Sequence, residues 1–430
     1  MDKIKRLDAK DQDFPNLLEK ALHRDHESDD KIFDAVASII KDVKIRKDSA
    51  VLEYTKKFDL YDVKSVTALE ITGFDTALSK IDKSLLNSLE ISSRRIFAYH
   101  ERQVAQSWEF SDDIGVSLGQ RITPLQSVGI YVPGGTASYP SSVLMNAIPA
   151  KVAGVSNITM VVPSQKGIVS EAVLAAAALS GVSRIFSIGG AQAIAALAYG
   201  TESIPRVDKI VGPGNVYVAS AKKQVFGDVG IDMVAGPSEI LIVCDGLTPP
   251  EWIATDLCSQ AEHDPNAQSI FISPDANQLD KVEEELNRIY KQLPRWKIIK
   301  SSLEKNGVFI KVDSVDEIAK IVDVIAPEHL ELSVAKPREL MSEIKNAGAV
   351  FLVRFCPEVF GDYCAGSNHV LPTSGAARFA SPLGVYDFQK RTSFVECNEL
   401  GASELGRISL QIANSEGLAA HAQSAKLRIK

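Results

Sequence analysis

Apolar residues recur at intervals of three and four positions along residues 1 to about 107, which is the spacing of one helix face. Ile32, Val36 and Ile39 form one such stripe, and Leu85 and Leu89 belong to a second. We therefore predict that this part of the chain is helical. Its histidines lie among charged residues, which is typical of a solvated helix surface rather than of a functional site. They are His23, His26 and His100.

From Val128 the pattern changes to short β-branched runs that end in glycine and are followed by alanine-rich stretches. Repeated strand, glycine turn and helix units predict a parallel sheet with helices on both of its faces. The turns lie at the carboxyl ends of the predicted strands, where open α/β sheets bind ligands. They are Gly134-Gly135, Gly189-Gly190 and Gly212-Pro213-Gly214.

A second α/β series begins with the strand pattern at 239–245 and runs to the strand pattern at 349–353. Between them we predict a helix near 250–262 and a charged amphipathic helix at about 277–293. The stretch 355–386 is rich in glycine, proline and aromatic residues and shows little periodicity. It predicts an ordered functional loop rather than a linker.

The composition is that of an ordinary globular protein, with 45% apolar and 24% charged residues among 430. The 47 lysines and arginines are outnumbered by 55 aspartates and glutamates, and a net charge of −8 works against nucleic-acid binding. The charged N-terminus lacks the apolar core of a secretory signal, and no apolar run approaches the roughly 20 residues of a membrane helix. The five cysteines form no CxxC pair, which argues against a disulfide framework and against a thiolate zinc site. We therefore predict a cytoplasmic protein with reduced thiols that binds neither nucleic acid nor membrane.

The sequence contains neither a GxGxxG nor a GxxxxGK[ST] motif, so its glycine turns can be either simple tight turns or a dinucleotide site. The histidines of the second half lie in the unusual local sequences SQAEHD, APEHLE, GSNHVLPT and GLAAHAQ. Gln260 and His263 share one face of a predicted helix and could bind one ion, with a surface hydrogen bond as the alternative. In the polar, helical tail after about residue 400, Glu416 and His421 are about 140° apart on an unbroken helix, so a shared target requires a local break.

Two further pairs combine a carboxylate with a histidine. Asp362 lies seven positions before His369 in a glycine-flanked loop, where both can converge on a ligand unless the carboxylate only caps a turn. Glu328 and His329 follow a proline, and in a turn two adjacent side chains can face one substrate as a general acid/base pair. A structural histidine is the alternative for His329.

Blocks along the chain resemble the histidinol dehydrogenase family closely and in matching order, from about residue 30 to the C-terminus. They are YVPGG, GGAQAIAALAYGTES, VGPGN, AGPSE, SQAEHD, APEHLE, GDYCAGSNHVLPT and YDFQKR. The resemblance implies a zinc-dependent and NAD-dependent oxidoreductase that converts L-histidinol through L-histidinal to L-histidine. This four-electron oxidation makes up the last steps of histidine biosynthesis.

The fold that the resemblance implies has two incomplete Rossmann-like domains with parallel sheets, the first interrupted by the second, and small helical N- and C-terminal segments. The C-terminal segment is exchanged in a homodimer, so that each site is shared between the chains. The boundaries expected on this basis are 1–25 for the N-terminal helical segment, 26–127 with 237–382 for the first domain, which carries the metal and acid/base residues, 128–236 for the second, NAD-side domain, and 383–430 for the C-terminal segment.

The resemblance also implies the site residues. The acid/base pair falls on Glu328 and His329, and the zinc ligands fall on Gln260, His263, Asp362 and His421. The substrate contacts comprise these four ligands and His329, together with Ser238, His369 and Glu416. The NAD-side positions are Tyr131, Gln192 and Asn215.

Three other interpretations are compatible with parts of this pattern. A relative that oxidises another small polar alcohol would keep the zinc and acid/base residues but lose imidazole recognition, and the presence of Glu416 and His369 favours histidinol. A zinc hydrolase would use Glu328 and bound water without nicotinamide, whereas the glycine turns favour a cofactor. A catalytically inactive binding module is disfavoured because every matched functional position is filled.

Overall fold

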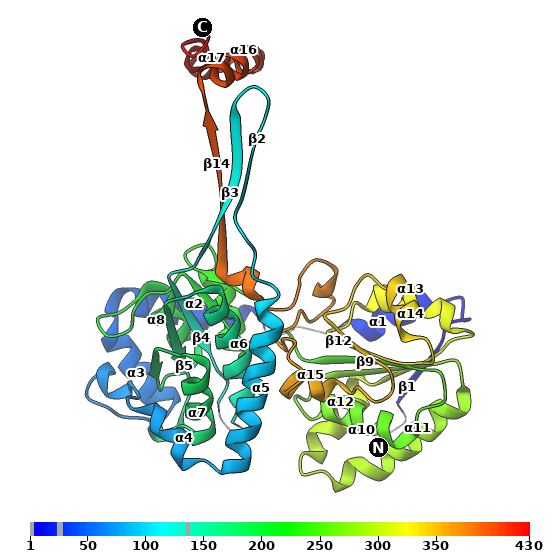
Figure 1. Cartoon of the computed structure of the whole chain (residues 1–430). Helices are drawn as coiled ribbons and strands as arrows, with labels where there is room; N and C mark the ends of the chain where they lie inside the picture. The colour runs from blue at the N-terminus through cyan, green and yellow to red at the C-terminus, as the bar shows by residue number, and fades with distance from the viewer. Residues whose placement is uncertain (1–3, 24–28, 135–137) are drawn as a thin grey trace.

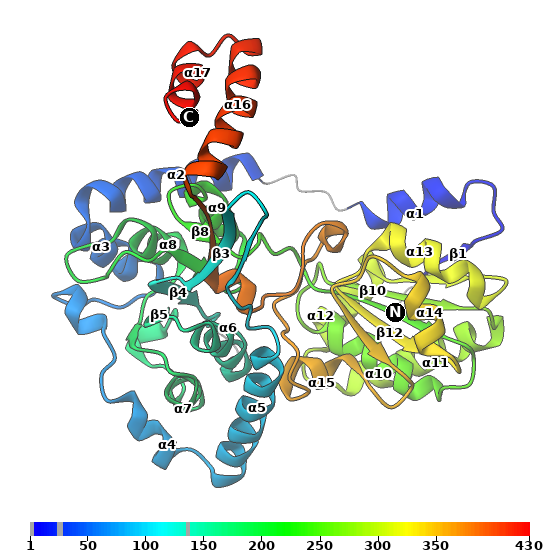
Figure 2. The same ribbon diagram turned by 45° about the horizontal axis from the view of Figure 1, so that its top comes forward.

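The computed structural model describes residues 4–23, 29–134 and 138–430 of the chain. Two α/β units lie side by side, and a long antiparallel ribbon projects beyond them (Figure 1, Figure 2). One unit is built on a five-stranded parallel sheet and the other on a six-stranded parallel sheet. The predicted α/β class with two parallel sheets is confirmed.

The five-stranded sheet has the order β6-β5-β4-β7-β8. Its strands are β4 (Ser127–Tyr131), β5 (Asn157–Val161), β6 (Arg184–Phe186), β7 (Lys209–Val211) and β8 (Gly230–Ile231), and its connecting helices are α6 (Pro140–Ala153), α7 (Glu171–Ser180), α8 (Gly190–Tyr199) and α9 (Val216–Val225). The chain moves outward from β4 to β6 and then returns to β7 on the other side of β4. This reversal creates a switch point between β4 and β7, where open sheets of this kind bind ligands.

The N-terminal helices pack on the five-stranded unit. They are α2 (Asp29–Arg46), α3 (Asp48–Phe58), α4 (Ala77–Lys80) and α5 (Lys83–Glu101). Val36 and Val43 of α2 share a buried apolar cluster with Ile194 and Leu197 of α8. The expected grouping of 26–127 with 237–382 is therefore corrected, because these helices complete the other sheet. The period of an apolar stripe predicts a helix but does not indicate which sheet will cover it.

The six-stranded sheet has the order β1-β11-β10-β9-β12-β13. Its strands are β1 (Lys5–Asp8), β9 (Glu239–Cys244), β10 (Gln268–Ser273), β11 (Val308–Lys311), β12 (His329–Ser333) and β13 (Ala349–Leu352). Its helices are α1 (Phe14–Leu22), α10 (Pro250–Ala261), α11 (Ala276–Ile289), α12 (Trp296–Asn306), α13 (Ile318–Ile325), α14 (Pro337–Glu343) and α15 (Glu358–Tyr363). Strands β9 to β13 repeat the order of the first sheet, with β9 in the place of β4.

The N-terminal segment 1–25, expected to be helical, contains a strand as well as a helix. Strand β1 pairs in parallel with β11 at the edge of the six-stranded sheet, with Lys5 opposite Val308. Helix α1 packs its Phe14 and Leu18 into the core of the same unit. Of the residues in β1 only Leu7 is buried, so this short polar strand shows no apolar alternation that a sequence pattern could reveal.

A three-stranded antiparallel ribbon and two helices form a projecting segment that we call the arm. It comprises β2 (Trp108–Ser111), β3 (Val116–Pro124), β14 (Gln389–Cys397), α16 (Glu399–Ser415) and α17 (Ala419–Lys426). Figure 1 shows the ribbon extending away from both units, with α16 and α17 at its far end. Strand β14 pairs with β3 along its whole length, yet nearly all of its side chains are exposed. The predicted helical tail is confirmed, whereas the ribbon that carries it was not predicted.

His100 differs from the expectation of a solvated surface, because it is fully buried on α5. Its Nδ1 lies 2.7 Å from the carbonyl oxygen of Ile96, and its Nε2 lies 3.4 Å from Nδ2 of Asn368. His26 lies outside the described residues. Among the described helices, none combines the length and the apolar character needed to cross a bilayer.

Candidate active site at the amino edge of the six-stranded sheet

Glu328 and His329 are positioned together by a neighbouring strand. His329 begins β12, and Glu328 immediately precedes the strand. Oε2 of Glu328 accepts a hydrogen bond from the Glu239 amide at 2.8 Å, and Nδ1 of His329 lies 2.9 Å from the Glu239 carbonyl oxygen. Both side chains are buried, and Nδ1 of His329 lies 3.6 Å from Oε2 of Glu328. The start of the strand therefore brings two adjacent side chains together that would point apart within it.

The surroundings of this pair are rich in negative charge. Burial raises the pKa of Glu328 to about 8, although His329 and the Glu239 amide oppose the shift. Burial lowers the pKa of His329, but the carboxylates of Glu328, Asp362 and Glu358 outweigh it and raise that pKa to about 10. Nε2 of His329 lies 3.7 Å from Oδ1 of Asp362 and 3.9 Å from Oε1 of Glu358. These carboxylates favour the protonated, positively charged form of His329.

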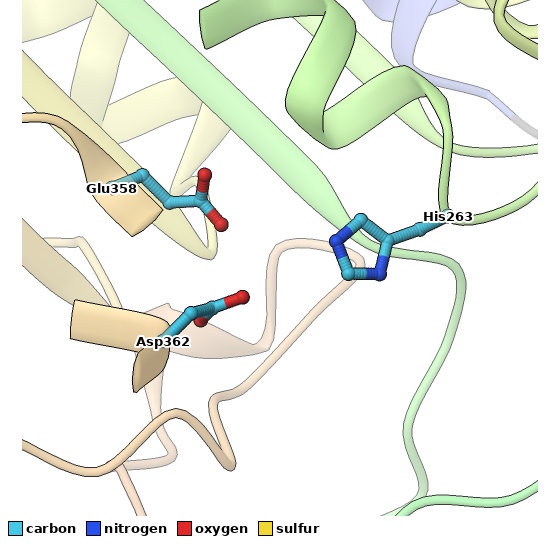
Figure 3. Close-up of side chains that lie close together, drawn as sticks. All are labelled: His263, Glu358 and Asp362. Atoms are coloured by element: carbon cyan, nitrogen blue, oxygen red, sulfur yellow. The ribbon is translucent and has the colours of Figure 1, made fainter. Parts of the chain in front are cut away.

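Three side chains next to the pair could hold a metal ion. Ligand atoms of His263, Glu358 and Asp362 all lie within 4.8 Å of one another, and Figure 3 shows the three side chains converging. Glu358 and Asp362 are four positions apart on the short helix α15, so they share a face. Burial alone would raise the pKa of Asp362, but His329 and His369 lower it to about 2, so this carboxylate is ionised.

Gln260 lies in the last turn of α10 and brings a side-chain oxygen close to the cluster. The helix ends at Ala261, so His263 lies in the turn just beyond it rather than on the predicted shared helix face. Its Oε1 is buried and has no hydrogen-bond partner within the described part of the chain. A buried amide oxygen rarely lacks a partner unless an ion or a water molecule binds to it. Imidazole, carboxylate and amide donors without sulfur suit zinc and similar divalent ions. The residues present therefore fit the zinc ion that the resemblance implies.

The remaining substrate positions of this unit lie at the same edge of the sheet. Nδ1 of His369 lies 3.0 Å from the carbonyl oxygen of Asp362 and 3.8 Å from its Oδ1. Ser238 immediately precedes β9, the strand whose Glu239 holds Glu328 and His329, the candidate acid/base pair. The stretch 355–386 supplies both Asp362 and His369. It is partly helical rather than a continuous loop, since Asp362 lies on helix α15, and its functional role stays a prediction.

Glu358 is a member of this cluster that the sequence did not reveal. It is nearly fully buried, and its Oε2 accepts a hydrogen bond from Oγ of Ser259 at 3.3 Å. Its backbone amide donates to Oε1 of Glu331 at 2.6 Å. Its spacing of four positions from Asp362 was the available signal, but a helix of only six residues is too short to show a period.

The structure does not bring Glu416 and His421 to the site of their own chain. Glu416 caps α16, His421 lies on α17, and Gly417 between them has a φ of +72° that breaks the helix. The local break that their spacing requires is thus present. Figure 1 and Figure 2 show both helices at the far end of the arm, away from α10 and α15.

The expected NAD-side residues lie at the carboxyl edge of the five-stranded sheet. Tyr131 ends β4, and its hydroxyl accepts a hydrogen bond from the Gly190 amide at 3.1 Å. Gln192 lies in the first turn of α8, and Asn215 caps α9 through the amides of Tyr217 and Val218. Tyr131 and Asn215 therefore flank the switch point between β4 and β7. Gly135 of the first glycine turn lies outside the described residues.

A family model described as histidinol dehydrogenase matches residues 22–429. The chain belongs to the histidinol dehydrogenase family. It is therefore an enzyme, an oxidoreductase, and the predicted resemblance is confirmed. Histidinol dehydrogenase from Pseudomonas aeruginosa is 55% identical over 428 residues, which cover 99% of this chain and 97% of the relative. The corresponding protein of Cupriavidus pinatubonensis is 54% identical over 433 residues, with the same coverage of 99% and 97%.

The histidinol dehydrogenase fold is also recovered by structural comparison. The crystal structure of histidinol dehydrogenase from Elizabethkingia anophelis matches with a TM-score of 0.93 at 33% sequence identity. The match covers 99% of this chain and 98% of that chain. The arrangement of the two units and the arm thus belongs to this family.

Proposed function

We propose that this protein catalyses the zinc- and NAD-dependent four-electron oxidation of L-histidinol through L-histidinal to L-histidine, in histidine biosynthesis. The observation that carries the proposal is the contact between the buried Glu328–His329 pair and the cluster of His263, Glu358 and Asp362. Family membership supports histidinol as the substrate. The five free cysteines fit a reducing compartment, and we propose a cytoplasmic location.

In this proposal Gln260, His263 and Asp362 hold the zinc ion, together with the partner subunit's His421. A zinc ion at these ligands would supply a Lewis acid that binds nitrogen groups of the substrate and would so help to fix the position of the reacting carbon. His369, Ser238 and the partner subunit's Glu416 contact the substrate. Tyr131, Gln192 and Asn215 form the NAD side of the site.

The hydrogen bonds of His329 suit it to the role of general base. The carbonyl oxygen of Glu239 accepts from Nδ1, which keeps a proton there and makes Nε2 the nitrogen that exchanges a proton with the substrate. The carboxylates that raise the pKa of His329 to about 10 include Asp362. A cation held by Asp362 would oppose their effect and so favour the neutral ring, in which Nε2 carries a lone pair. In the first oxidation Nε2 takes the hydroxyl proton while the carbon transfers a hydride to NAD, so that the alcohol becomes an aldehyde. The second oxidation requires water to add to the aldehyde and form a gem-diol.

Glu328 is suited to the addition of water. Its raised pKa of about 8 places its titration near neutrality, which is the range expected of an effective general base. Glu328 takes a proton from the attacking water. After His329 has released its first proton to solvent, it takes a hydroxyl proton of the gem-diol as a second hydride leaves for a second NAD. The products of one turnover are histidine and two NADH.

We further propose a homodimer in which the arms are exchanged. The arm exposes apolar side chains, including Trp108, Phe110, Val395 and Ile408, which is typical of a surface that packs on another chain. Its helices α16 and α17, which carry Glu416 and His421, lie away from the candidate site of their own chain (Figure 1). A second copy of this chain would cover the exposed apolar side chains of the arm, and its candidate site would accept Glu416 and His421.

The experiment that tests the proposed function mixes the protein with zinc, NAD and L-histidinol and follows NADH absorbance. We expect two NADH for each histidinol consumed. One NADH would indicate an enzyme that stops at the aldehyde. A hydrolase would form none, and a panel of other small amino alcohols would reveal a relative with a different substrate.

A further inference from the structure

Lys222 on α9 and Asp232 just after β8 form a buried ion pair in the five-stranded unit. The exposed fractions of their side chains are only 3% and 1%. Removing two charges from water is expensive, and apolar residues of similar volume often stabilise a core as well or better. Stability alone therefore does not explain an ion pair at this place.

Both members of the pair hydrogen-bond the backbone of the same residue. Nζ of Lys222 donates to the Gly212 carbonyl oxygen at 2.9 Å, and the Gly212 amide donates to Oδ2 of Asp232 at 2.8 Å. Gly212 has a φ of +105°, and a Cβ atom there would lie 2.1 Å from the carbonyl oxygen of Tyr131. The ion pair therefore holds the N–H and C=O groups of a residue whose left-handed conformation only glycine could adopt here.

Gly212 begins the turn that leads from β7 into α9. The turn runs through Pro213 and Gly214 to Asn215, whose exposed side chain caps the helix. Its backbone passes directly beside Tyr131 at the end of β4. Pro213 and Gly214 are half-buried and Asn215 is exposed, whereas Gly212 and the two charges that hold it are buried.

We propose that Lys222 and Asp232 are positioning residues for NAD binding, which hold the turn at 212–215 in the conformation that receives the dinucleotide. This inference rests on the proposed function, because it assigns NAD to that turn. Neither side chain touches the cofactor. Asp232 also begins the segment that leads to Ser238, so the same ion pair connects the cofactor turn to the entry of the substrate-side sheet.

The double variant Lys222→Met/Asp232→Asn tests the proposal. It removes both charges together, so that no unpaired buried charge remains, and the asparagine still accepts from the Gly212 amide. We expect a folded dimer in which the Kd and the KM for NAD rise about tenfold, the order expected when a hydrogen bond from a charged donor is lost. The kcat at saturating NAD and the KM for histidinol should stay within about twofold of the wild-type values.

The double variant Arg184→Met/Glu70→Gln is the matched control. It removes another ion pair of the same unit, in which Nε of Arg184 lies 2.7 Å from Oε1 of Glu70, away from the glycine turn. We expect this control to bind NAD as the wild type does. An equal rise in Kd in both double variants would indicate general loosening of the unit and would overturn the proposal.

Calorimetric titration of the wild-type protein with NAD is the first measurement. No binding to the wild type contradicts the proposed function, whereas unchanged binding to a folded Lys222→Met/Asp232→Asn variant contradicts only this inference. If that variant does not fold, Lys222→Arg is used, because it keeps the charge but moves the donor atom. A weaker Kd for NAD at an unchanged melting temperature is then expected, and an unchanged Kd overturns the proposal.

Discussion

At the scale of single residues, Glu239 organises the candidate catalytic pair through its backbone. Its amide donates to Glu328, and its carbonyl oxygen accepts from His329. The backbone of one residue therefore positions both side chains. Glu239 is in turn positioned by the Ser374 amide, which donates to its Oε1 at 2.8 Å. The pair therefore depends on contacts that join β9, β12 and the loop after α15.

The division of labour between His329 and Glu328 leads to a first prediction. His329→Asn should slow the oxidation of both histidinol and histidinal by about 10²-fold or more, since each step requires removal of a hydroxyl proton. Glu328→Gln should slow the oxidation of histidinal more than that of histidinol, because only the aldehyde requires activated water. Steady-state rates with each substrate measure the two effects. Equal losses on both substrates in Glu328→Gln would contradict the assignment.

The buried His100 leads to a second prediction, about stability and pH. Burial lowers its pKa below the ordinary value of 6.5. The unfolded chain therefore takes up a proton below about pH 6.5 that the folded protein resists, so stability is fully present above that pH and is lost as the pH falls toward the folded pKa. The loss has a slope of at most about 1.4 kcal/mol per pH unit.

Comparison with His100→Gln isolates this contribution from that of the other histidines. The free energy of unfolding of the wild type should fall more steeply than that of the variant between about pH 7 and pH 5. Denaturant unfolding at several pH values measures both curves. Parallel curves would show that His100 does not titrate on unfolding.

At the scale of elements, the candidate metal ligands come from two helices that belong to different parts of the chain. Helix α10 ends at Ala261, just before His263, and the short helix α15 presents Glu358 and Asp362 on one face. The first residues of β9 and β12 position the candidate acid/base pair beside them. The candidate site therefore lies at the amino edge of its sheet, whereas the residues expected to face NAD lie at the carboxyl edge of the other sheet.

This arrangement leads to a third prediction, that activity requires one divalent metal ion per site. Dialysis against a strong chelator should abolish activity, and added zinc should restore it. Acid should weaken metal binding, because imidazole ligands must be neutral to bind. Measurements of metal content and activity after dialysis, after addition of zinc and at several pH values check these expectations. Full activity in protein free of metal would contradict the prediction.

Two variants test the position of the metal. Asp362→Asn should bind the metal more weakly than the wild type, whereas Asp245→Asn should bind it as the wild type does.

At the scale of the whole molecule, Glu416 at the end of α16 and His421 on α17 belong to the arm, whose helices lie far from α10 and α15 of the same chain (Figure 1). In a two-fold dimer of identical chains, the residues of each arm can reach the site of the other chain. The proposed dimer would then contain two sites, each built from both chains. Such sites can be tested by complementation.

The fourth prediction concerns mixtures of two inactive chains. His329→Asn and His421→Ala chains, unfolded and refolded together in equal amounts, should form mixed dimers in about half of the cases. Each mixed dimer should contain one site with both defects and one with neither, so activity should return to about a quarter of the wild-type value. If each site belonged to one chain, every site would keep one defect, and no activity above that of the two parent variants would appear.

Most of the local structure could be predicted from the sequence. Apolar periods and glycine turns indicated the strands and helices of both α/β series, because each pattern reflects neighbours within a few positions. Distinctive short blocks indicated the family. The spacing of Gln260 and His263 indicated a shared helix face, although His263 lies just beyond the end of α10. The predicted roles of Tyr131, Gln192 and Asn215 remain predictions, as do the zinc and NAD assignments.

Only the tertiary structure decided how these elements meet. Strand β1 joins the six-stranded sheet through β11, α2 packs on α8, and Glu358 enters the candidate metal cluster. Lys222 and Asp232 meet at the backbone of Gly212, and His100 is buried rather than solvated. These contacts join residues far apart in the sequence, and the burial that determines them depends on which surfaces cover one another in three dimensions. A local pattern records the face that a segment must bury, but not the partner that buries it.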